Sequence, residues 1–367
     1  MGLMLPSRLS CLLACLLIST ATSAGPLNPP PGPIESTMKT LDEIEPRTNI
    51  DRMPSSATAK HVILQPGSYY LTSDLVGEPG KHGIEIAADD VTIDLMGFAL
   101  LGPGGATDND AIKVSPGPRR TGIHIRNGTI ANWEDGVDLS NSSGVTCDSI
   151  VSTFNAGKGI WLGDQAVVTH CIAQNNGGNG FEAEVGAVID QCAAHNNWGG
   201  ILVYQVATIT NCAAWANAFI GIEAHYFSVI SNCTAHNNGE AGIASDAGTL
   251  VSRCTAQYNT FGIWVRDRST VRECTVSDNF FGIAVRCCGS GCHIESNTVN
   301  GPGMYGITVD DDPAANHHLI IRNSVQGVLT SYFIPTRSSF GPIVDVSGGG
   351  DISAVSGSDH PLANLVH

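Results

Sequence analysis

The sequence is poor in charge, and poorest in positive charge. Charged residues make up 14% of its 367 residues, with 18 Lys and Arg against 34 Asp and Glu. Nucleic acids and anionic lipids are bound through clustered basic side chains. The acidic excess therefore argues against both as the main partner. It is compatible with a neutral glycan, or with an acidic glycan that meets a local basic patch.

Patterns typical of helices and of membrane spans are also scarce. Apolar residues do not recur at helical spacing and instead form short alternating runs, such as Ile263-Trp264-Val265-Arg266. Alternation of this kind indicates strands with one buried face. The apolar stretch from Leu9 to Ile18 is too short to cross a bilayer, and no later segment could do so.

The N-terminus has the pattern of a targeting segment. A short region ending in Arg8 precedes the apolar stretch, and Thr22-Ser23-Ala24 forms an acceptable cleavage site before Gly25. Residues 1–24 therefore predict a signal peptide and a secreted or periplasmic protein. Leu12-Leu13-Ala14-Cys15 also fits a lipoprotein cleavage box, but it leaves only a stub of apolar core and ranks below ordinary secretion. Residues 25–60 are rich in proline and predict an extended linker and lead-in.

What the sequence does contain is a repeat. Seven cysteines recur at nearly regular intervals, each within one phrase of β-branched residues, Cys, small residues, Asn, a short loop and Gly-Ile: Cys147, Cys171, Cys192, Cys212, Cys233, Cys254 and Cys274. A period of about 21 residues held over many copies predicts a stacked solenoid. Each unit offers about three short strands broken by Gly and Asn, which suits one coil of a parallel β-helix.

The position of the cysteine within the repeated phrase, the cysteine slot, is filled by other residues in further copies. These copies carry a family resemblance. Asn127 in Ile125-Arg126-Asn127-Gly128-Thr129-Ile130, Asn297 and Asn323 are assigned to the slot, and so is Gly97. This phrase resembles the Ile-x-Asn-x-x-Ile bend of the right-handed parallel β-helix superfamily, which includes pectate lyases, polygalacturonases and repeat-bearing relatives. The resemblance covers roughly residues 61–330 and implies the fold. The chain lacks the calcium aspartate set of pectate lyases and the motif series of polygalacturonases, so no named activity is implied.

The predicted fold is therefore all-β, a right-handed parallel β-helix of about eleven coils with covered ends. We expect the β-helix to span residues 61–335 and a C-terminal cap to span residues 336–367. The apolar side chains expected to cover the last coil are Ile343, Val344, Val346, Leu362 and Leu365. We expect a monomer.

Stacking geometry argues against disulfides within the cysteine column. Equivalent side chains on adjacent coils lie about 5 Å apart, whereas the Cβ atoms of a disulfide lie about 3.8 Å apart. Ligands in a straight line cannot surround one zinc ion, so we expect buried thiols that act as small apolar fillers. A loop disulfide to Cys292 from Cys287 or Cys288 remains open. No cofactor is certain; acidity alone allows calcium, but no ligand spacing such as an EF-hand loop is present.

Two further columns are assigned structural roles. One stands five positions after each cysteine and predicts a ladder of stacked amides, with the members Asn176, Asn197, Asn217, Asn238, Asn259 and Asn279. The other precedes the Gly-Ile phrase and predicts stacked rings, with the members Trp198, Phe219, Phe261, Phe281 and Tyr305.

Function is expected where the repeat is broken, on the outward positions of the first strand of each coil. One outward column reads Asp138, Trp161, Glu182, Leu202, Glu223, Ala244, Trp264, Ala284 and Thr308. The second reads Ser140, Gly163, Glu184, Tyr204, His225, Asp246, Arg266, Arg286 and Asp310. In the polysaccharide-cleaving members of the superfamily the substrate lies along this face, so the resemblance implies a groove here.

The side chains of this face suit chemistry on a glycan. Trp161 and Trp264 are predicted as exposed platforms for sugar rings, while Arg286 and Asp310 extend the binding surface. Tyr204, His225, Asp246 and Arg266 follow one another on four coils and supply a base, an acid and a cation. For a lyase or epimerase, Arg266, with or without Arg286, would neutralise a uronate, with His225 or Tyr204 as base.

Two alternatives stay open beside this interpretation. For a hydrolase, Glu182 and Glu184 should lie about 7 Å apart on one strand, in the inverting range, whereas Glu182 and Glu223 should lie about 10 Å apart. The other alternative is a non-catalytic protein of the cell surface or envelope, either glycan-binding or purely structural. A solvated sheet also needs charged side chains that pair across strands, and it would show a similar pattern. Asp310-Asp311-Asp312, with His317 and His318 beyond, could bind a metal but suits a solvated loop better.

Overall fold

The computed structural model describes residues 47–104, 108–286, 290–301, 303–310, 317–335, 337–348 and 352–367. The predicted signal peptide and residues 25–46 of the linker lie outside the described residues. So do Cys287, Cys288 and the Asp311-Asp312 pair, and the hypotheses that concern them stay predictions.

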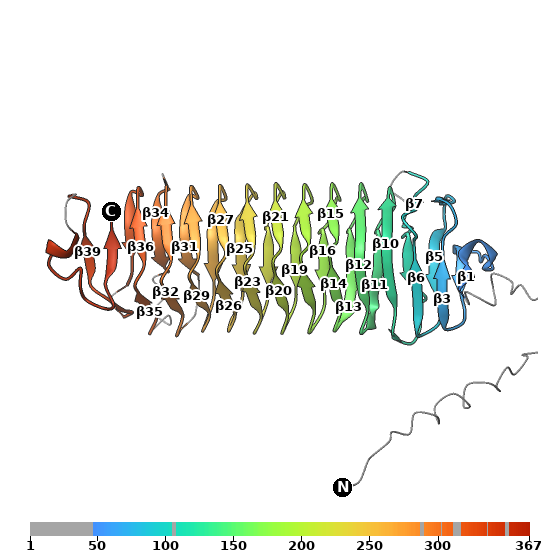
Figure 1. The fold of residues 1–367 in the computed structure, drawn as a ribbon, viewed down its shortest axis with the longest axis horizontal. Coiled ribbons are helices and arrows are strands. Elements are labelled where there is room, and N and C mark those ends of the chain that lie inside the picture. The colour runs from blue at the N-terminus through green and yellow to red at the C-terminus, as the bar shows by residue number, and fades with distance from the viewer. Residues whose placement is uncertain are drawn as a thin grey trace, which may run out of the picture. The chain divides into compact units, whose positions relative to one another are not determined.

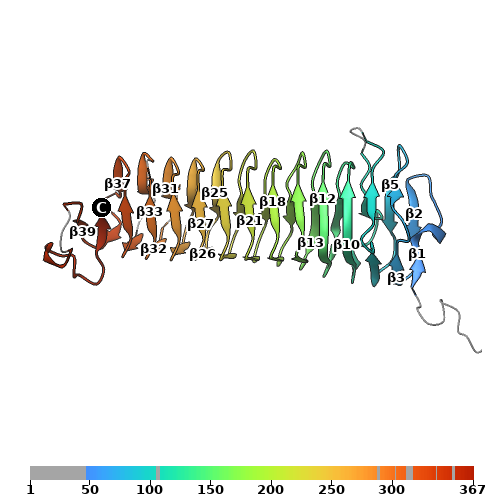
Figure 2. The ribbon, with the colours of Figure 1, turned by 45° about the horizontal axis from the view of Figure 1, so that its top comes forward.

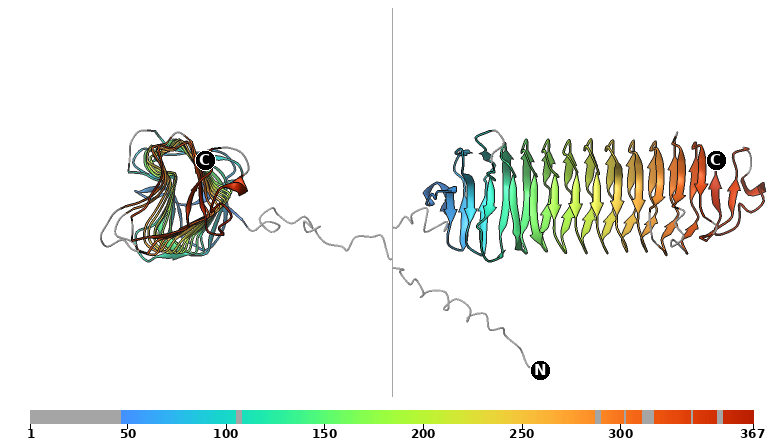
Figure 3. Two further views of the ribbon diagram at one scale, coloured as in Figure 1. Left: turned by 90° about the vertical axis from the view of Figure 1, so that its left-hand side faces the viewer. Right: turned by 180° about the vertical axis from the view of Figure 1, so that it is seen from behind.

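From residue 47 onward the chain coils into a parallel β-solenoid (Figure 1). Short parallel strands follow one another along a single row of coils, as the rotated view also shows (Figure 2). Seen from one end, the coils superpose around one core (Figure 3). Among the described residues no helix is long and apolar enough to cross a membrane.

The strands form three ladders, because each coil contributes up to three strands. The first ladder consists of β2 (Ala59–Ile63), β5 (His82–Ile86), β8 (Ile112–Val114), β11 (Val137–Ser143), β13 (Ile160–Asp164), β16 (Phe181–Ala183), β19 (Ile201–Val203), β22 (Ile222–Ala224), β25 (Ala241–Ser245), β28 (Phe261–Val265), β31 (Phe281–Val285), β34 (Tyr305–Val309) and β37 (Thr330–Phe333), with β9 (Arg120–Thr121) paired to β11.

The second ladder consists of β1 (Thr48–Asn49), β3 (Gly67–Tyr70), β6 (Val91–Asp94), β10 (His124–Ala131), β12 (Thr146–Thr153), β14 (Val167–Thr169), β17 (Val188–Asp190), β20 (Thr208–Thr210), β23 (Val229–Ser231), β26 (Leu250–Ser252), β29 (Thr270–Arg272), β32 (His293–Glu295), β35 (Leu319–Ile321) and β38 (Ser339–Phe340). The third ladder shares β10 and β12 and adds β4 (Leu75–Val76), β7 (Ala99–Leu101), β15 (Ile172–Gln174), β18 (Ala193–His195), β21 (Ala213–Trp215), β24 (Thr234–His236), β27 (Thr255–Gln257), β30 (Thr275–Ser277), β33 (Thr298–Asn300), β36 (Ser324–Gln326), β40 (Asn364–Val366) and β39 (Ile343–Asp345). Two 3-10 turns, η1 (Ile50–Arg52) and η2 (Ile352–Ala354), lie near the ends.

The fold class is the predicted one, but the coil count is higher. Thirteen strands follow one another in the first ladder among the described residues, against about eleven predicted coils. The two additional coils lie at opposite ends of the ladder, because β2 precedes the coil of Gly97 and β37 follows the coil of Asn323. Near the C-terminus, β38 pairs with β35 and β40 pairs with β36, so these strands extend the second and third ladders. Of the side chains expected to cover the last coil, Val344 is buried and Ile343 is exposed.

The bends between strands depend on residues with left-handed backbone. One bend residue stands directly before the cysteine slot, at φ +54° in His170, +56° in Asn232 and +58° in Arg322. A second bend stands before the amide ladder, as in Asn175 at φ +56° and Asn237 at +55°. Asn tolerates this conformation better than most residues, which explains why it recurs in the repeat phrase.

The cysteine column is buried and reduced, but it has six members rather than seven. Cys171 to Cys274 occupy one register, and each thiol donates to the carbonyl two positions before it, at 3.2 Å from Cys171 to Thr169. Cys147 instead pairs with Val168, one strand earlier in the coil, and Ile150 occupies the slot. The predicted place of Cys147 is therefore wrong, and the longer interval between Cys147 and Cys171 reflects this shift.

Asn127 and Gly97 are displaced in the same way. Asn127 lies in the left-handed bend at φ +62°, and the next residue, Gly128, pairs with Ile150 of the slot. Gly97 also lies in a bend, at φ +83°. Asn297 and Asn323 do occupy the slot, where Nδ2 of Asn297 donates to Oδ1 of Asn323 at 3.0 Å.

The predicted amide ladder is confirmed. Each buried Asn donates from Nδ2 to Oδ1 of the next, at 2.9 Å from Asn176 to Asn197 and 3.0 Å from Asn217 to Asn238. The same Oδ1 atoms accept a backbone N–H from the preceding coil. The aromatic column forms two separate stacks rather than one, Trp198 on Phe219 and Phe261–Phe281–Tyr305.

Candidate functional site

The two outward columns of the first ladder have the register expected from the sequence. Glu182 pairs with Trp161 and Leu202, and Glu223 pairs with Leu202 and Ala244. Their inward neighbours, such as Phe181 and Ile222, are buried in the core. The second outward column follows the strand ends, where the backbone N–H groups of Tyr204, His225 and Asp246 each bond to the preceding coil.

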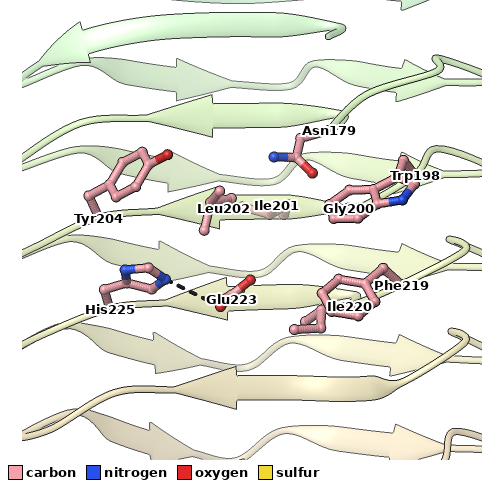
Figure 4. Close-up of a pocket in the computed structure, with 11 residues that line it drawn as sticks. Asn179, Trp198, Gly200, Ile201, Leu202, Tyr204, Phe219, Ile220, Glu223 and His225 are labelled. Atoms are coloured by element: carbon pink, nitrogen blue, oxygen red, sulfur yellow. Dashed lines mark hydrogen bonds and ion pairs between the residues drawn. The ribbon is translucent and has the colours of Figure 1, made fainter. Parts of the chain in front are cut away.

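A hollow of about 230 Å³ lies on this face at β19 and β22 (Figure 4). Trp198 and Phe219 stand at one side, Tyr204 and His225 at the other, and Leu202 and Glu223 lie between them. The residues that line it are Asn179, Trp198, Gly199, Gly200, Ile201, Leu202, Tyr204, Phe219, Ile220, Glu223 and His225. Three of the predicted catalytic residues are thus brought together: Tyr204, Glu223 and His225.

His225 is held between two carboxylates. Its Nε2 lies 3.2 Å from Oε1 of Glu223, and its Nδ1 lies 3.7 Å from Oδ2 of Asp246. The hydrogen bond to Glu223 raises the pKa of His225 above its ordinary value of 6.5, and the charges of Glu223 and Asp246 add to this. His225 therefore keeps its proton to a higher pH than a solvated histidine.

Asp246 links His225 to a guanidinium. Its Oδ1 accepts from Nη1 of Arg266 at 2.9 Å, and Arg266 is exposed. Glu223, His225, Asp246 and Arg266 therefore form one continuous chain of charges over three coils. Such a chain fixes the orientation of the imidazole and places a cation at its far end.

Tyr204 is tied to a buried carboxylate. Its hydroxyl donates to Oε1 of Glu182 at 3.2 Å, and Glu182 is only 4% exposed. Burial, followed by the charge of Glu182, raises the pKa of Tyr204 to about 12. Tyr204 is therefore a phenol that keeps its proton at neutral pH, and a weak candidate for the base.

The oxygens of Glu182 are already occupied. Nζ of Lys158 donates to Oε1 at 2.9 Å, and Nδ2 of Asn179 donates to Oε2 at 2.8 Å. A carboxylate held by three donors from three coils is suited to positioning and poorly suited to acting as a free base or nucleophile. Burial and the charge of Glu182 raise the pKa of Glu184, which lies farther along the same face.

Sequence reasoning missed Lys158 and Asn179. Each stands two positions before the first inward-pointing residue of its strand, which is Ile160 for Lys158 and Phe181 for Asn179. The equivalent position on the next coil is Gly199. From Asn179 onward the equivalent positions carry no charged residue. The lysine at position 158 therefore departs from its column, and this departure is the signal that could have revealed Lys158. The aromatic pair Trp198 and Phe219 was assigned only a structural role, yet it borders the hollow.

The predicted exposure of Trp264 is wrong. It is 9% exposed and packs against Ala244 and Ala284, the small side chains on the coils at either side. The guanidinium carbons of Arg266 and Arg286 lie 5.2 and 5.4 Å from its ring centroid. Its faces are therefore covered by neighbours of its own column and by cations, which leaves no platform for a sugar.

Trp161 is half-buried rather than exposed. Nζ of Lys158 lies 3.1 Å from its ring centroid, so a cation covers one face. Trp198 is the tryptophan of this region that presents a surface: it is 52% exposed and stacks on Phe219 with centroids 4.9 Å apart. The platform predicted at Trp161 and Trp264 therefore fits Trp198 better.

Arg286 and Asp310 lie farther along the second outward column. The guanidinium of Arg286 stands over the rings of Phe261 and Trp264. Asp310 is exposed at the end of β34. Neither residue lines the hollow at β19 and β22.

A second hollow, of about 220 Å³, lies on the N-terminal coils of the same face. It is lined by Lys113, Val114, Ser115, Pro116, Asp138, Ser140 and Asn141. Lys113 bonds to Asp110 at 2.7 Å and to Asp138 at 3.0 Å, so its charge is neutralised. A cation that is already paired twice is poorly placed to bind an anionic ligand.

The described residues give no support to the metal-binding and disulfide hypotheses. No group of three His, Cys, Asp or Glu side chains in the described part of the chain is placed to hold a metal ion. Cys292 is a free, buried thiol that donates to the carbonyl of Arg266 at 3.1 Å. The two cysteines considered as its disulfide partners lie outside the described residues.

Comparison with known proteins agrees with this architecture. The family model described as right handed beta helix region matches residues 107–213 and 188–325. The chain belongs to this family. The family accounts for the parallel coils and the inward core on which the hollow is built.

Two solved structures of the same fold are similar over most of their length. The A-module of mannuronan C-5 epimerase AlgE4 of Azotobacter vinelandii is 16% identical, with 80% of this chain and 99% of that one covered and a TM-score of 0.59. The A-module of mannuronan C-5 epimerase AlgE6 of the same organism is 15% identical, with 79% and 97% covered and a TM-score of 0.60. At these identities the likeness shows the fold alone. A search of curated proteins finds no match.

Proposed function

We propose that this protein is exported and acts on a uronic-acid polysaccharide, abstracting the proton beside the sugar carboxylate as a lyase or an epimerase does. The observation that carries the proposal is the charge chain Glu223–His225–Asp246–Arg266 at the edge of the hollow. It puts a titratable imidazole next to a guanidinium on an outward face. The similar modules are mannuronan C-5 epimerases, so this fold also carries chemistry at C-5 of a polysaccharide sugar.

Arg266 would take the carboxylate of the reacting sugar. Its Cα lies two strands from that of His225, about 10 Å along the ladder, and its side chain already reaches back to Asp246. A guanidinium beside the carboxylate stabilises the negative charge that develops when the neighbouring C–H bond breaks. Arg286, one coil farther, would meet the next carboxylate of the polymer.

His225 and Tyr204 would divide the proton transfers. The neutral imidazole of His225 accepts the C-5 proton, which requires a pH above its raised pKa. Tyr204, protonated at neutral pH, is the acid. In a lyase the electrons of the C–H bond form a C4–C5 double bond, the C4–O bond breaks and Tyr204 protonates the leaving oxygen. In an epimerase the C-5 carbon is reprotonated on its opposite side instead.

The hydrolase alternative has less support. It needs two carboxyl groups with separate roles, and Glu182 is held by Lys158, Tyr204 and Asn179. The second candidate function is glycan binding without turnover. It is favoured by one observation, the 52% exposed ring of Trp198 stacked on Phe219 beside the hollow.

The test is a panel of neutral and acidic polysaccharides incubated with the full chain. Products are followed by absorbance of unsaturated uronates for a lyase, by NMR of the C-5 configuration for an epimerase, and by new reducing ends for a hydrolase. We expect turnover of a polyuronate that is abolished by His225→Ala and by Arg266→Ala while binding persists. His236→Ala is the matched control, because His236 stacks on Trp215 in the third ladder. Binding without turnover, lost in Trp198→Ala, would support the second candidate, and no binding of any glycan would refute both.

A further inference from the structure

Four exposed apolar side chains form a ridge beside Tyr204 and His225. Val185 is 40% exposed, Val206 57%, Tyr226 43% and Phe227 64%, and they lie on three successive coils. Val206 and Phe227 each stand two positions after a wall residue of the hollow, Tyr204 and His225 respectively. The apolar ridge, defined by these four residues, therefore borders the hollow at the ends of β19 and β22.

Two of the four ridge residues adopt a backbone conformation that their side chains disfavour. Val206 has φ +52° and Phe227 has φ +57°, in the left-handed region that is unfavourable for β-branched and bulky side chains. Strained backbone of this kind persists where the surrounding structure imposes it.

The repeat itself supplies the comparison. The same bend on the other coils carries Gln165, Gly186, Gly248, Arg268 and Gly291, all at positive φ. Glycine or a polar residue therefore suffices for the turn. The apolar exceptions fall on the two coils whose strand ends wall the hollow. Gly248 also leaves room for the ring of Phe227, since a Cβ there would lie 2.6 Å from Cδ1 of Phe227.

The net charge of the protein bears on which partner could cover the ridge. The chain carries a formal net charge of −16, which opposes both a second copy and an anionic membrane. Glu184 precedes Val185 directly, and Asp246 lies on the coil after His225, so the ridge is also flanked by carboxylates. A small neutral apolar group brings no charge to the ridge, and under the proposed function the carboxylates of the polymer that carries it are met by Arg266 and Arg286.

We infer that the apolar ridge binds an O-acyl substituent, such as an acetyl ester, on the polysaccharide that occupies the hollow. The inference rests on the proposed function and specifies its substrate: the sugar at the Tyr204 and His225 side carries the ester, and its methyl group packs on Val206 and Phe227. Burial of one apolar carbon changes an affinity by roughly fourfold.

The test compares one acetylated polyuronate with the same polymer after mild alkaline deacetylation. Dissociation constants are measured by isothermal titration calorimetry for the full chain, for the double variant Val206→Gly/Phe227→Gly and for Tyr258→Gly. Glycine is compatible with the backbone at all three positions, since Tyr258 has φ +57°. Tyr258 is 60% exposed and lies in the bend that follows β27, in the third ladder. It is therefore the matched control.

We expect the wild type to prefer the acetylated polymer by roughly fourfold or more. The double variant should lose this preference with its affinity for the deacetylated polymer unchanged, and Tyr258→Gly should keep it. Equal binding of both polymers by the wild type would overturn the inference and leave the proposed function standing. Binding of neither would overturn the proposed function and the inference with it. A wild-type dimer in sedimentation that the double variant dissolves would assign the ridge to a second copy and overturn the inference.

Discussion

Nε2 of His225 lies 3.2 Å from Oε1 of Glu223, the outward residue at the centre of strand β22. The two side chains stand two positions apart on one chain segment, so no movement between coils can separate them. This hydrogen bond is the main reason that the pKa of His225 is raised. It couples the charge of the hollow to pH within the range where histidine titrates.

Replacement of Glu223 by Gln should shift the pH dependence of turnover. Without the carboxylate the pKa of His225 falls toward its ordinary value, so the neutral imidazole forms at lower pH. The ascending limb of kcat/KM against pH should therefore move to lower pH in Glu223→Gln. Glu240→Gln is the control, because Glu240 precedes the start of β25, away from His225. A limb that stays in place would show that His225 is not the base.

Lys158 should stabilise the fold through Glu182. Lys158→Met leaves a carboxylate that is 4% exposed without its cation, and loss of one partner of a buried pair costs about 3 kcal/mol. We expect the free energy of unfolding in urea to fall by that amount in Lys158→Met. The double variant Lys158→Met/Glu182→Gln should recover most of the loss, because no buried charge is then left unpaired. Losses that simply add in the double variant would show that the two residues do not interact.

The amide ladder should be sensitive to a single truncation. Asn238→Ala removes the Oδ1 that accepts both the backbone N–H and the Nδ2 of Asn217, and leaves two buried donors unsatisfied. The expected loss is about 3 kcal/mol in the free energy of unfolding, measured by chemical denaturation. Thr234→Ala, on the exposed side of the preceding strand β24, should change it by less than about 0.5 kcal/mol. Similar losses in both variants would contradict a special role for the ladder.

The sequence pattern predicted the direction of each side chain better than its surroundings. The period of the repeat and the alternation along each strand place Glu182, Glu223 and Trp264 on one outward column, as observed. Alternation reports only which way a Cβ points. Trp264 is covered because Ala244 and Ala284 leave space beside it and two arginines lie over it, and neither fact follows from its own position.

The pairing register of the strands is the second feature that the sequence pattern did not predict. Cys147 shares its phrase with the later cysteines, so its sequence surroundings assigned it to their slot. Only the pairing of Thr146–Asp148 with Val167–Thr169 shows that it belongs to the preceding strand. Lys158 does not belong to the alternating pattern, because it lies before the strand rather than on it. The long reach of a lysine side chain, which spans a coil to Glu182, is not visible in a residue pattern.

Asp135 should make stability depend on pH. It lies beside the charged network of the N-terminal coils, and burial raises its pKa to about 6 from an ordinary 3.8. A carboxyl whose pKa is raised by folding binds its proton more tightly in the folded state, so its contribution to stability improves as pH falls from about 6 to 3.8 and is unfavourable above that range.

Asp135→Asn keeps the Oδ1 that accepts the backbone N–H of Lys158 and removes the charge. The Tm of Asp135→Asn should therefore exceed that of the wild type at pH above 6, with the difference vanishing below pH 3.8. An exposed carboxylate gives the control: Glu273→Gln should leave Tm close to the wild type across the same range. A Tm difference for Asp135→Asn that does not change with pH would mean that the substitution acts through packing and that the carboxyl does not titrate as described.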